Sequence, residues 1–494
     1  MRSAGLAKSA LALLLLVGRM APLWGQSMTT NQGVTYALLD GSALIDDCLI
    51  CDRPTIAVPL RGSFRLRLLD VNPLFERFAL DGIAFTAGAA PGRQYKVTGG
   101  GTYQQGGEVA LFQQMFLQVN IDDGVSNRLA YLTNGATTVP RSWPMIQIAV
   151  DQTNGTLAQT YSLQIAAAPV QEIWFSTARG FTAGAWAAPT NKVSAGDLIS
   201  AGGRVVKANA DLMQRLGIMP PTPDLGLNAV DILPGGEVVF SLNQDVFSET
   251  LGALQNGDLV SANGRIVMRN QDFTRAFGLP APVPDAGLDG AQLQDDGEVY
   301  FSTRSNLMSA AGVTLHHGDL LSDRGVIVKS NQQLLANLHP VDPSPDYGLR
   351  AFYVWPSGEI WFSVAQGFQA QSAGQIQPGD LLSDQGYIVF RNAELVSLFA
   401  PVEGLADYGL DALYIVTDAI PPALAPLLVP PQTLASPAGI RLGWDGKGRV
   451  FQVEASPLVT GPFLPASPIQ PDSSFDDVSL PAGDARRFYR VRQW

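Results

Sequence analysis

The sequence predicts an all-β fold with three parts: an N-terminal β-sandwich, a four-bladed β-propeller-like repeat domain with a short helix in each repeat, and a small C-terminal β-sandwich. Three observations lead to this fold class. Gly (50) and Pro (34) are frequent in the 494 residues, which favours many turns and therefore many short strands. A motif recurs every 61 residues through the middle of the chain. Segments of alternating apolar and polar residues flank these repeats on both sides.

The composition excludes several classes of protein. A net charge of −12 and a pI near 4.7 argue against a nucleic-acid-binding surface. Three His and two Cys are too few for a zinc-finger array, an iron–sulfur protein or a disulfide-dense scaffold.

Residues 1–26 resemble an export signal. Arg2 and Lys8 give the start a positive charge, and the apolar stretch 10–17 is too short to span a bilayer. We therefore predict a protein that is secreted, held at the cell surface or kept in the periplasm, with no membrane insertion after the signal is cleaved.

Residues 27–169 form the predicted β-sandwich. Segments such as FRLRLLDV, RFALDGIAF and MIQIAVDQ have the composition of strands and are separated by Gly, Asn and Asp turns.

A C-x-x-C pair, Cys48 and Cys51, lies near the start of this domain. The neighbouring carboxylates of Asp46, Asp47 and Asp52 disfavour the thiolate that redox catalysis needs. We predict a structural disulfide that closes a small loop, with redox chemistry or half of a zinc site as the alternatives.

The repeat domain spans residues 172–416, and its units share landmarks 61 residues apart. A Gly-Asp-Leu-x-Ser motif starts at Gly196, Gly257, Gly318 and Gly379. An Asn ahead of a short apolar stretch predicts a helix N-cap at Asn209, Asn270, Asn331 and Asn392. An Asp-x-Gly-Leu segment begins at Asp224, Asp285, Asp346 and Asp407. The first unit also carries a four-residue insertion near Trp186.

The ends of the array favour a closed ring over an open solenoid. The array begins with an unmatched second strand at residues 172–177 and ends with an unmatched first strand at 409–416. In a ring these two strands complete one blade and leave no open edge. A strand at residues 161–168 is the alternative partner for the first of them.

The repeat unit resembles the hemopexin-like propeller blade. Asp411-Ala412 and Asn228-Ala229 fit the opening motif of that blade, whereas Asp289-Gly290 and Arg350-Ala351 match it in part. The resemblance implies four-bladed topology and an ion, such as Ca²⁺, on the propeller axis. The units here are longer, and no disulfide joins the first and last blades.

The end of the chain has two parts. Residues 417–433 are rich in Pro and predict a stiff linker. Residues 434–494 resemble a small fibronectin-like β-sandwich found on large secreted bacterial proteins, with Trp444, Phe451 and Tyr489 on its strands. That resemblance implies an accessory or secretion-associated module.

The sequence predicts no catalytic residues. No G-x-S-x-G, H-E-x-x-H, P-loop or Rossmann glycine pattern occurs, and His316 and His317 are found in one unit alone. Three carboxylate series recur in every unit, which indicates a structural role first. The second of them is the candidate Ca²⁺ site. The series are Asp197, Asp258, Asp319 and Asp380; Asp224, Asp285, Asp346 and Asp407; and Glu172, Glu237, Glu298 and Glu359.

Tyr347 and Tyr408 are the candidate ligand-binding residues, because both are expected in loops where an exposed ring could stack on a sugar or a protein. The sequence thus predicts an exported, non-enzymatic protein that binds a protein or a polysaccharide. The alternative is an extracellular polysaccharide hydrolase that uses paired carboxylates from the repeat loops.

Overall fold

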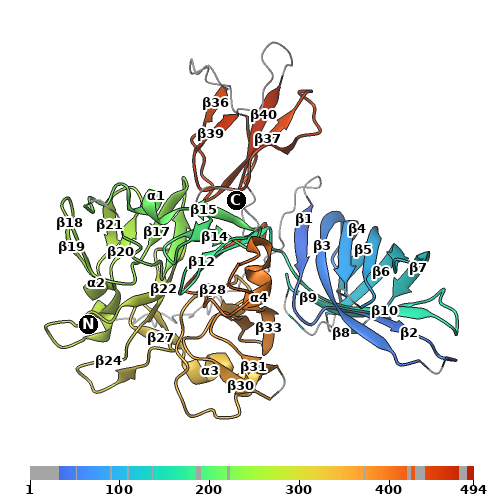
Figure 1. The fold of residues 1–494 in the computed structure, drawn as a ribbon, viewed down its shortest axis with the longest axis horizontal. Coiled ribbons are helices and arrows are strands. Elements are labelled where there is room, and N and C mark those ends of the chain that lie inside the picture. The colour runs from blue at the N-terminus through green and yellow to red at the C-terminus, as the bar shows by residue number, and fades with distance from the viewer. Residues whose placement is uncertain are drawn as a thin grey trace, which may run out of the picture.

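A computed structural model describes residues 33–51, 53–88, 92–107, 111–135, 137–138, 141, 143–184, 191–219, 223–371, 373–419, 424–428, 440–477 and 487–494. The predicted export signal and the insertion near Trp186 lie outside these residues. Within the described ranges, no helix is long and apolar enough to cross a membrane. The all-β fold class is confirmed, and the chain forms three lobes (Figure 1).

The N-terminal domain is one sheet that returns on itself. Its strand order is β10-β2-β3-β4-β5-β6-β7-β9, and β9 pairs again with β10. Side chains of alternate residues point inward and fill the enclosed core with aromatic and aliphatic groups, including Tyr36, Phe64, Phe78 and Tyr103. The strands are β1 (Val34–Leu38), β2 (Ala43–Asp47), β3 (Ile56–Val71), β4 (Phe75–Ala87), β5 (Tyr95–Gly106), β6 (Phe112–Asp122), β7 (Asn127–Thr133), β8 (Thr137–Thr138), β9 (Ile146–Gln152) and β10 (Thr160–Ala168).

The repeat domain contains four four-stranded antiparallel sheets. The first unit contributes β11 (Glu172–Ser176), β14 (Leu198–Ser200) and β15 (Arg204–Lys207). The other sheets are, in order, β16 (Val230–Leu233), β17 (Glu237–Phe240), β20 (Leu259–Ser261) and β21 (Arg265–Met268); β22 (Leu288–Leu293), β23 (Val299–Thr303), β26 (Leu320–Ser322) and β27 (Val326–Lys329); and β28 (Phe352–Val354), β29 (Ile360–Phe362), β32 (Leu381–Ser383) and β33 (Tyr387–Phe390).

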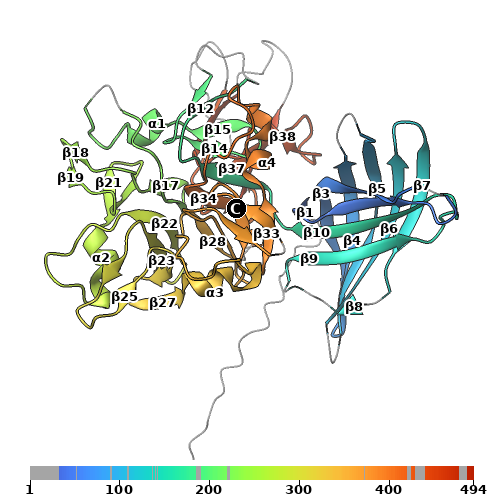
Figure 2. The same ribbon diagram turned by 60° about the horizontal axis from the view of Figure 1, so that its bottom comes forward.

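The pairing predicted between the two ends of the array is present. β34 (Ala412–Val416) pairs with β11 along its whole length, from Glu172 opposite Val416 to Ser176 opposite Ala412. The alternative partner, residues 161–168, belongs to β10 of the N-terminal domain. β16, β22, β28 and β34 contact one another, and Figure 2 shows β22, β28 and β34 near the centre of this domain. The four sheets therefore form a propeller-like ring with these strands innermost.

Each unit adds a hairpin and a short helix to its sheet. The hairpins are β12 (Phe181–Thr182) with β13 (Lys192–Val193), β18 (Val246–Ser248) with β19 (Gly252–Leu254), β24 (Leu307–Met308) with β25 (Thr314–Leu315), and β30 (Phe368–Ala370) with β31 (Gly374–Ile376). The helices are α1 (Asn209–Met213), α2 (Asn270–Thr274), α3 (Asn331–Leu335) and α4 (Asn392–Leu395).

The predicted N-cap position is wrong by one residue. Each repeated Asn is the first residue inside the helix, and the N-cap is the residue before it, as at Ser330, whose hydroxyl accepts from the Gln333 N–H. The Asn side chain is used elsewhere because it joins two loops: Asn209 and Asn270 donate to the Pro223 and Pro284 carbonyls.

The C-terminal domain consists of two small sheets. One has the order β35-β40-β37-β38 and the other pairs β36 with β39. Their bounds are β35 (Leu427–Leu428), β36 (Ile440–Gly443), β37 (Phe451–Ser456), β38 (Leu464–Pro465), β39 (Ser474–Asp477) and β40 (Phe488–Gln493). The predicted linker 417–433 needs correction, because its residues 427–428 form β35 of this domain and Asp418 binds Arg492.

Both outer domains pack tightly on the repeat domain. Arg141 of the N-terminal domain forms a buried ion pair with Glu359, at 3.0 Å. The C-terminal domain approaches the β16–β17 turn so closely that a Cβ on Gly236 would lie 1.7 Å from the Pro471 carbonyl oxygen. The core of the repeat domain continues into the C-terminal domain through Val450 and Ile469. The three lobes are therefore joined by packed interfaces.

Candidate functional site

The innermost strands of the repeat domain carry one side chain each into the wall of a shared cavity. These residues occupy the same position in successive units, 61 residues apart: Asp231, Gln292, Tyr353 and Tyr414. The cavity has a volume of about 750 Å³, which is within the range of small-molecule sites.

The other two domains complete the wall of this axial cavity. The N-terminal domain contributes Trp143 and Pro144, and the C-terminal domain contributes Arg449. Tyr300 and Trp355 of the repeat domain add two further aromatic rings. The cavity thus lies where all three domains meet.

Asp231 and Arg449 are the charged pair at the inner end of the cavity. Arg449 Nη1 lies 3.5 Å from Asp231 Oδ1 and donates to the Ile232 carbonyl at 2.8 Å. The Asp231 carboxylate also accepts from the backbone N–H groups of Ile232 and Leu293, both at 2.7 Å. Burial raises the pKa of Asp231 to about 6, although Arg449 and these N–H groups act in the opposite direction.

Two of the inner-strand side chains also tie one unit to the next. Asp231 accepts from the backbone of Leu293, and Gln292 accepts from the backbone of Val354 at 2.7 Å; in each pair the residues are 62 apart. The side chains at this position therefore fix the spacing of the inner strands around the cavity.

The carboxylates nearer to the mouth of the cavity already have partners. Asp295 binds Arg449 at 3.1 Å, and Asp296 binds Arg324 at 2.8 Å. Glu298 binds Arg324 at 3.1 Å and accepts from the Ser322 hydroxyl. These acidic groups are therefore held in place by cations and hydroxyls of the protein.

A second set of polar residues lies three positions earlier in each unit: Asn228, Asp289, Arg350 and Asp411. Arg350 forms an ion pair with Asp411. Burial raises the pKa of Asp289 to about 7, with Arg350 opposing the shift and Asp411 adding to it. The positive charge in this set comes from a side chain of the protein.

The expectation that Tyr347 and Tyr408 are exposed is wrong. Both rings are buried, and their hydroxyls donate to the carbonyls of Asp342 and Gly404, each at 2.7 Å. Their apolar rings pack in the cores of their own units because the loop that carries them folds back onto the hairpin. Neither ring is available for stacking on a ligand.

The four candidate Ca²⁺ ligands are bound to backbone amides within their own units. Asp224 accepts from Ala195 and Gly196, and Asp346 accepts from Gly318 and Gly348. Asp285 and Asp407 accept from Gly287 and Gly409 in the same way. Among the described residues, no three His, Cys, Asp or Glu side chains gather as metal ligands. The Ca²⁺ assignment stays a prediction, and the geometry gives these residues a structural role.

The other two carboxylate series serve the repeat as expected. Asp197, Asp258, Asp319 and Asp380 each accept from the backbone N–H of the Asn twelve residues later, which starts the helix. Glu172, Glu237, Glu298 and Glu359 each accept from the serine hydroxyl of the Gly-Asp-Leu-x-Ser motif. His317 lies 3.5 Å from Asp346, at the loop that this Asp organises.

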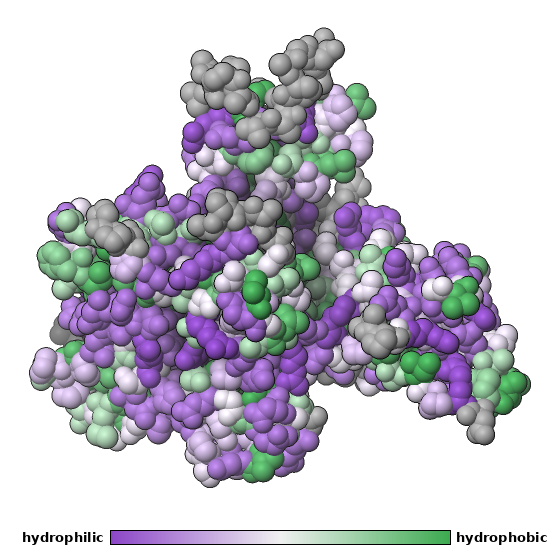
Figure 3. Space-filling view, viewed as in Figure 1, coloured by the Kyte–Doolittle hydropathy of each residue, from purple (hydrophilic) through white to green (hydrophobic). Residues whose placement is uncertain are grey.

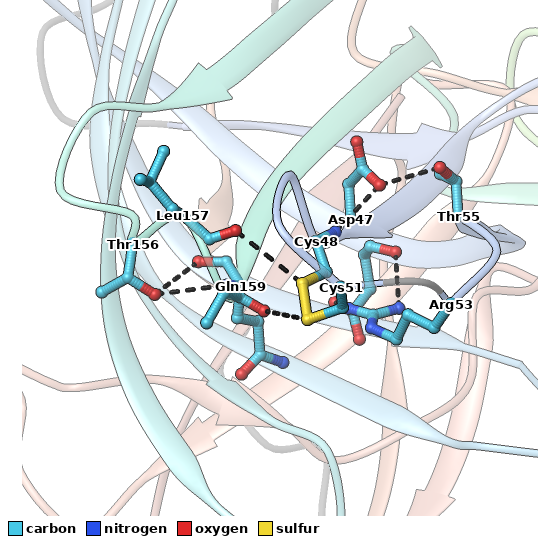
Figure 4. The surroundings of a disulfide bond; sticks show 10 residues. Asp47, Cys48, Cys51, Arg53, Thr55, Thr156, Leu157 and Gln159 are labelled. Atoms are coloured by element: carbon cyan, nitrogen blue, oxygen red, sulfur yellow. Dashed lines mark hydrogen bonds and ion pairs between the residues drawn. A yellow bond between two sulfur atoms is a disulfide. The ribbon is translucent and has the colours of Figure 1, made fainter.

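The predicted disulfide between Cys48 and Cys51 is present, at the end of the N-terminal domain (Figure 4). The Cys48 N–H and the Thr55 hydroxyl both donate to Asp47 Oδ1 and hold the loop in shape. The disulfide presents Leu49 and Ile50 to solvent, and Figure 3 shows an apolar patch at this far end of the domain.

Sequence reasoning missed the axial cavity because its wall residues differ between units. The search followed residues that recur, and those residues build the unit itself. The available signal was the opposite one: an inner-strand position that keeps the 61-residue period but holds Asp, Gln, Tyr and Tyr. The contributions of Trp143 and Arg449 have no such period and depend on how the domains pack.

No protein-family model and no curated protein sequence matches this chain. Among solved structures, it is similar to an extracellular domain from B. thetaiotaomicron that is attributed to a one-component system. The identity is 7%, the comparison covers 94% of this chain and 96% of that chain, and the TM-score is 0.18. A likeness at this level carries no argument about the present chain.

Proposed function

We propose that this chain is an exported, non-enzymatic binding protein whose ligand occupies the axial cavity. The observation that carries the proposal is the cavity itself, about 750 Å³ in volume and walled by residues of all three domains. Ligand sites favour junctions between domains, where a few polar groups converge among apolar and aromatic walls. Trp143, Tyr300 and Trp355 supply such walls, and Asp231 and Gln292 supply the polar groups.

The state of the carboxylates favours binding over hydrolysis. A glycosidase needs one carboxyl group to give up a proton and another that is free to attack or to activate water. Here Asp295, Asp296 and Glu298 are paired with arginines. An enzyme is the second candidate, and the observation that favours it is the raised pKa of Asp231, a property of general acids.

A pull-down of the chain from Ser27 against insoluble polysaccharides and envelope fractions tests the proposal, with reducing sugar measured in the supernatant. We expect retention without sugar release. Tyr300→Leu, which removes an aromatic wall of the cavity, should weaken retention about threefold to tenfold, as expected for one aromatic contact. The control is Arg265→Met, since Arg265 pairs with Glu237 and does not line the cavity.

Two results would contradict the proposal. Retention that Tyr300→Leu leaves unchanged would place the ligand outside the cavity. Sugar release that Asp231→Asn abolishes would establish the enzyme instead.

A further inference from the structure

The outer face of the N-terminal sheet carries a second set of residues suited to a ligand. Along β6, alternate residues such as Met115 and Leu117 are buried, while Gln114, Phe116 and Gln118 are exposed. Neighbouring strands β5 and β7 pair with β6 on either side, so their outward side chains extend the same face. We call Phe116, Tyr131, Gln114, Gln118 and Asn120 the platform.

An aromatic pair forms the centre of the platform. The rings of Phe116 and Tyr131 have centroids 6.3 Å apart and planes only 17° apart. Phe116 is 42% exposed, although a large apolar side chain gains free energy from burial. In the strand register, Phe116 lies opposite Thr102 on one side and Thr133 on the other, so polar hydroxyls flank the ring.

Amide side chains surround the aromatic pair. Gln114, Gln118 and Asn120 project from alternate positions of β6 and are exposed. Within the described part of the chain, the amide groups of these three residues make no hydrogen bond. Each can donate two hydrogen bonds and accept others, which suits a ligand with many hydroxyl groups.

The platform contains no charge. Residues 98–105, 113–121 and 129–133 of the three strands include no Asp, Glu, Lys or Arg, whereas 15% of the whole chain is charged. The outward position of β5 beside Gln118 is Gly100, so the strand presents bare backbone there. A charged polymer would find no counter-charge on this surface.

We propose that the platform binds a neutral polysaccharide chain. The apolar face of a sugar ring can pack on Phe116 and Tyr131, while its hydroxyls exchange hydrogen bonds with the amides on either side. A nucleic acid needs basic residues, and the centre of a protein interface is a continuous apolar patch rather than rings separated by amides. The repeated polar and apolar groups of a saccharide match both features of the platform.

This site is independent of the axial cavity. Figures 1 and 2 both place β6 and β7 on the side of the N-terminal domain that faces away from the repeat domain. None of the platform residues lines the cavity. A substitution on one site can therefore be tested without disturbing the other.

Affinity electrophoresis of the chain from Ser27 tests the proposal. Native gels would contain a soluble neutral polysaccharide (a mixed-linkage β-glucan, a xyloglucan, a glucomannan or an amylopectin) or an anionic one (alginate or polygalacturonate). We expect at least one neutral polymer to retard the protein. The double variant Phe116→Ala/Tyr131→Ala should weaken this binding by on the order of tenfold, and Gln118→Ala by about threefold.

The matched control is Phe247→Ala, which removes a 69% exposed Phe from β18 in the repeat domain and should leave retardation unchanged. Retardation by no neutral polymer, or by anionic polymers alone, would overturn the proposal. So would retardation that persists in the double variant. Loss of binding in Tyr300→Leu with the platform intact would instead support the axial cavity as the site.

Discussion

Buried charged side chains link the N-terminal domain to the repeat domain, and Arg141 with Glu359 is the most buried pair. The exposed fractions of the two side chains are 7% and 6%. Glu359 also accepts from Trp361 Nε1 and the Ser383 hydroxyl, and the Arg141 guanidinium lies over the Tyr387 ring. Removing one partner of such a pair leaves the other charge buried without compensation.

We therefore expect Arg141→Met to lower the free energy of unfolding by about 3 kcal/mol. Chemical denaturation followed by tryptophan fluorescence would measure it. The control is Arg324→Met: Arg324 pairs with Asp296, and both side chains are more than half exposed, so a change below about 1 kcal/mol is expected. Equal effects of the two substitutions would show that the buried pair has no special weight.

Asp289 should make stability depend on pH. Its pKa is raised to about 7 in the folded protein, so between the pKa of the unfolded chain and pH 7 the folded state binds more protons. Stability from this group is complete at low pH and is lost as pH rises through about 7. Asp289→Asn, which stays neutral, should be more stable than the parent at pH 8 by up to about 4 kcal/mol, with the difference vanishing near pH 4.

Melting temperatures of the two proteins between pH 4 and 8 would measure this effect. Asp296→Asn is the opposite control, because the Glu298 N–H and Arg324 lower the pKa of Asp296. That substitution should become more harmful, not less, as the pH rises through acidic values. A constant difference between Asp289→Asn and the parent at every pH would contradict the prediction.

At the scale of single residues, the sequence predicted chemistry that is local. The disulfide of Cys48 and Cys51 is closed within four residues, and the structural use of the repeated carboxylates follows from their recurrence. The burial of Tyr347 and Tyr408 could not be seen, because it depends on loops folding back onto their hairpins. The asymmetric wall of the axial cavity was missed for the same reason.

The structural element that organises the repeat is the Gly-Asp-Leu-x-Ser loop. Its glycine has no room for a side chain: a Cβ on Gly257 would lie 2.3 Å from Asp285 Oδ1 and 2.7 Å from Asn270 Oδ1. The same close approach recurs at Gly196, Gly318 and Gly379. The glycine lets the Asp and the Asn of one unit meet the loop backbone.

Gly257→Ala should therefore lower stability by about 2 kcal/mol, since the Asp or the Asn must move away from its backbone partners. Thermal unfolding would measure the loss. Gly443→Ala provides the control, because nothing lies within 4 Å of a Cβ there and its backbone is not left-handed. Tolerance of Gly257→Ala would mean that these loop contacts contribute little.

Most elements of the repeat domain followed from the sequence. The 61-residue period, the strand order and the pairing of its first and last strands are all observed. The interlocking serines were not predicted: Ser176, Ser241 and Ser363 each donate to a backbone carbonyl of the next unit. A motif shows that a Ser recurs, but its partner is known only once neighbouring sheets are placed.

At the scale of the whole molecule, the C-terminal domain is docked on the repeat domain through the β16–β17 turn. Gly235 N–H donates to the Gly448 carbonyl at 2.8 Å, and Gly236 touches the Pro471 carbonyl. Arg449 reaches from the same surface to the axial cavity. The prediction of an independent module on a stiff linker missed this contact, because interfaces between domains leave no periodic signal in the sequence.

Two neighbouring glycines allow a matched test of the docking. Both have a left-handed backbone, at φ +87° and +83°, so an alanine costs a similar strain at each. A Cβ on Gly236 would overlap Pro471, whereas nothing lies within 4 Å of one on Gly235. Gly236→Ala should release the C-terminal domain, seen as a larger radius of gyration in X-ray scattering, and Gly235→Ala should not. The same radius for both variants would contradict the interface.

The pairing of β34 with β11 also imposes an order of events on a chain that is synthesised, and exported, from its N-terminus. When β11 leaves the ribosome or a translocation channel, one of its edges has no partner until residues 412–416 follow. An open edge of this kind can pair with another chain. Every other unit can complete its own sheet before that moment. The unit that begins the ring is thus the last to be finished, and the chain is most open to mispairing just before its final strand arrives.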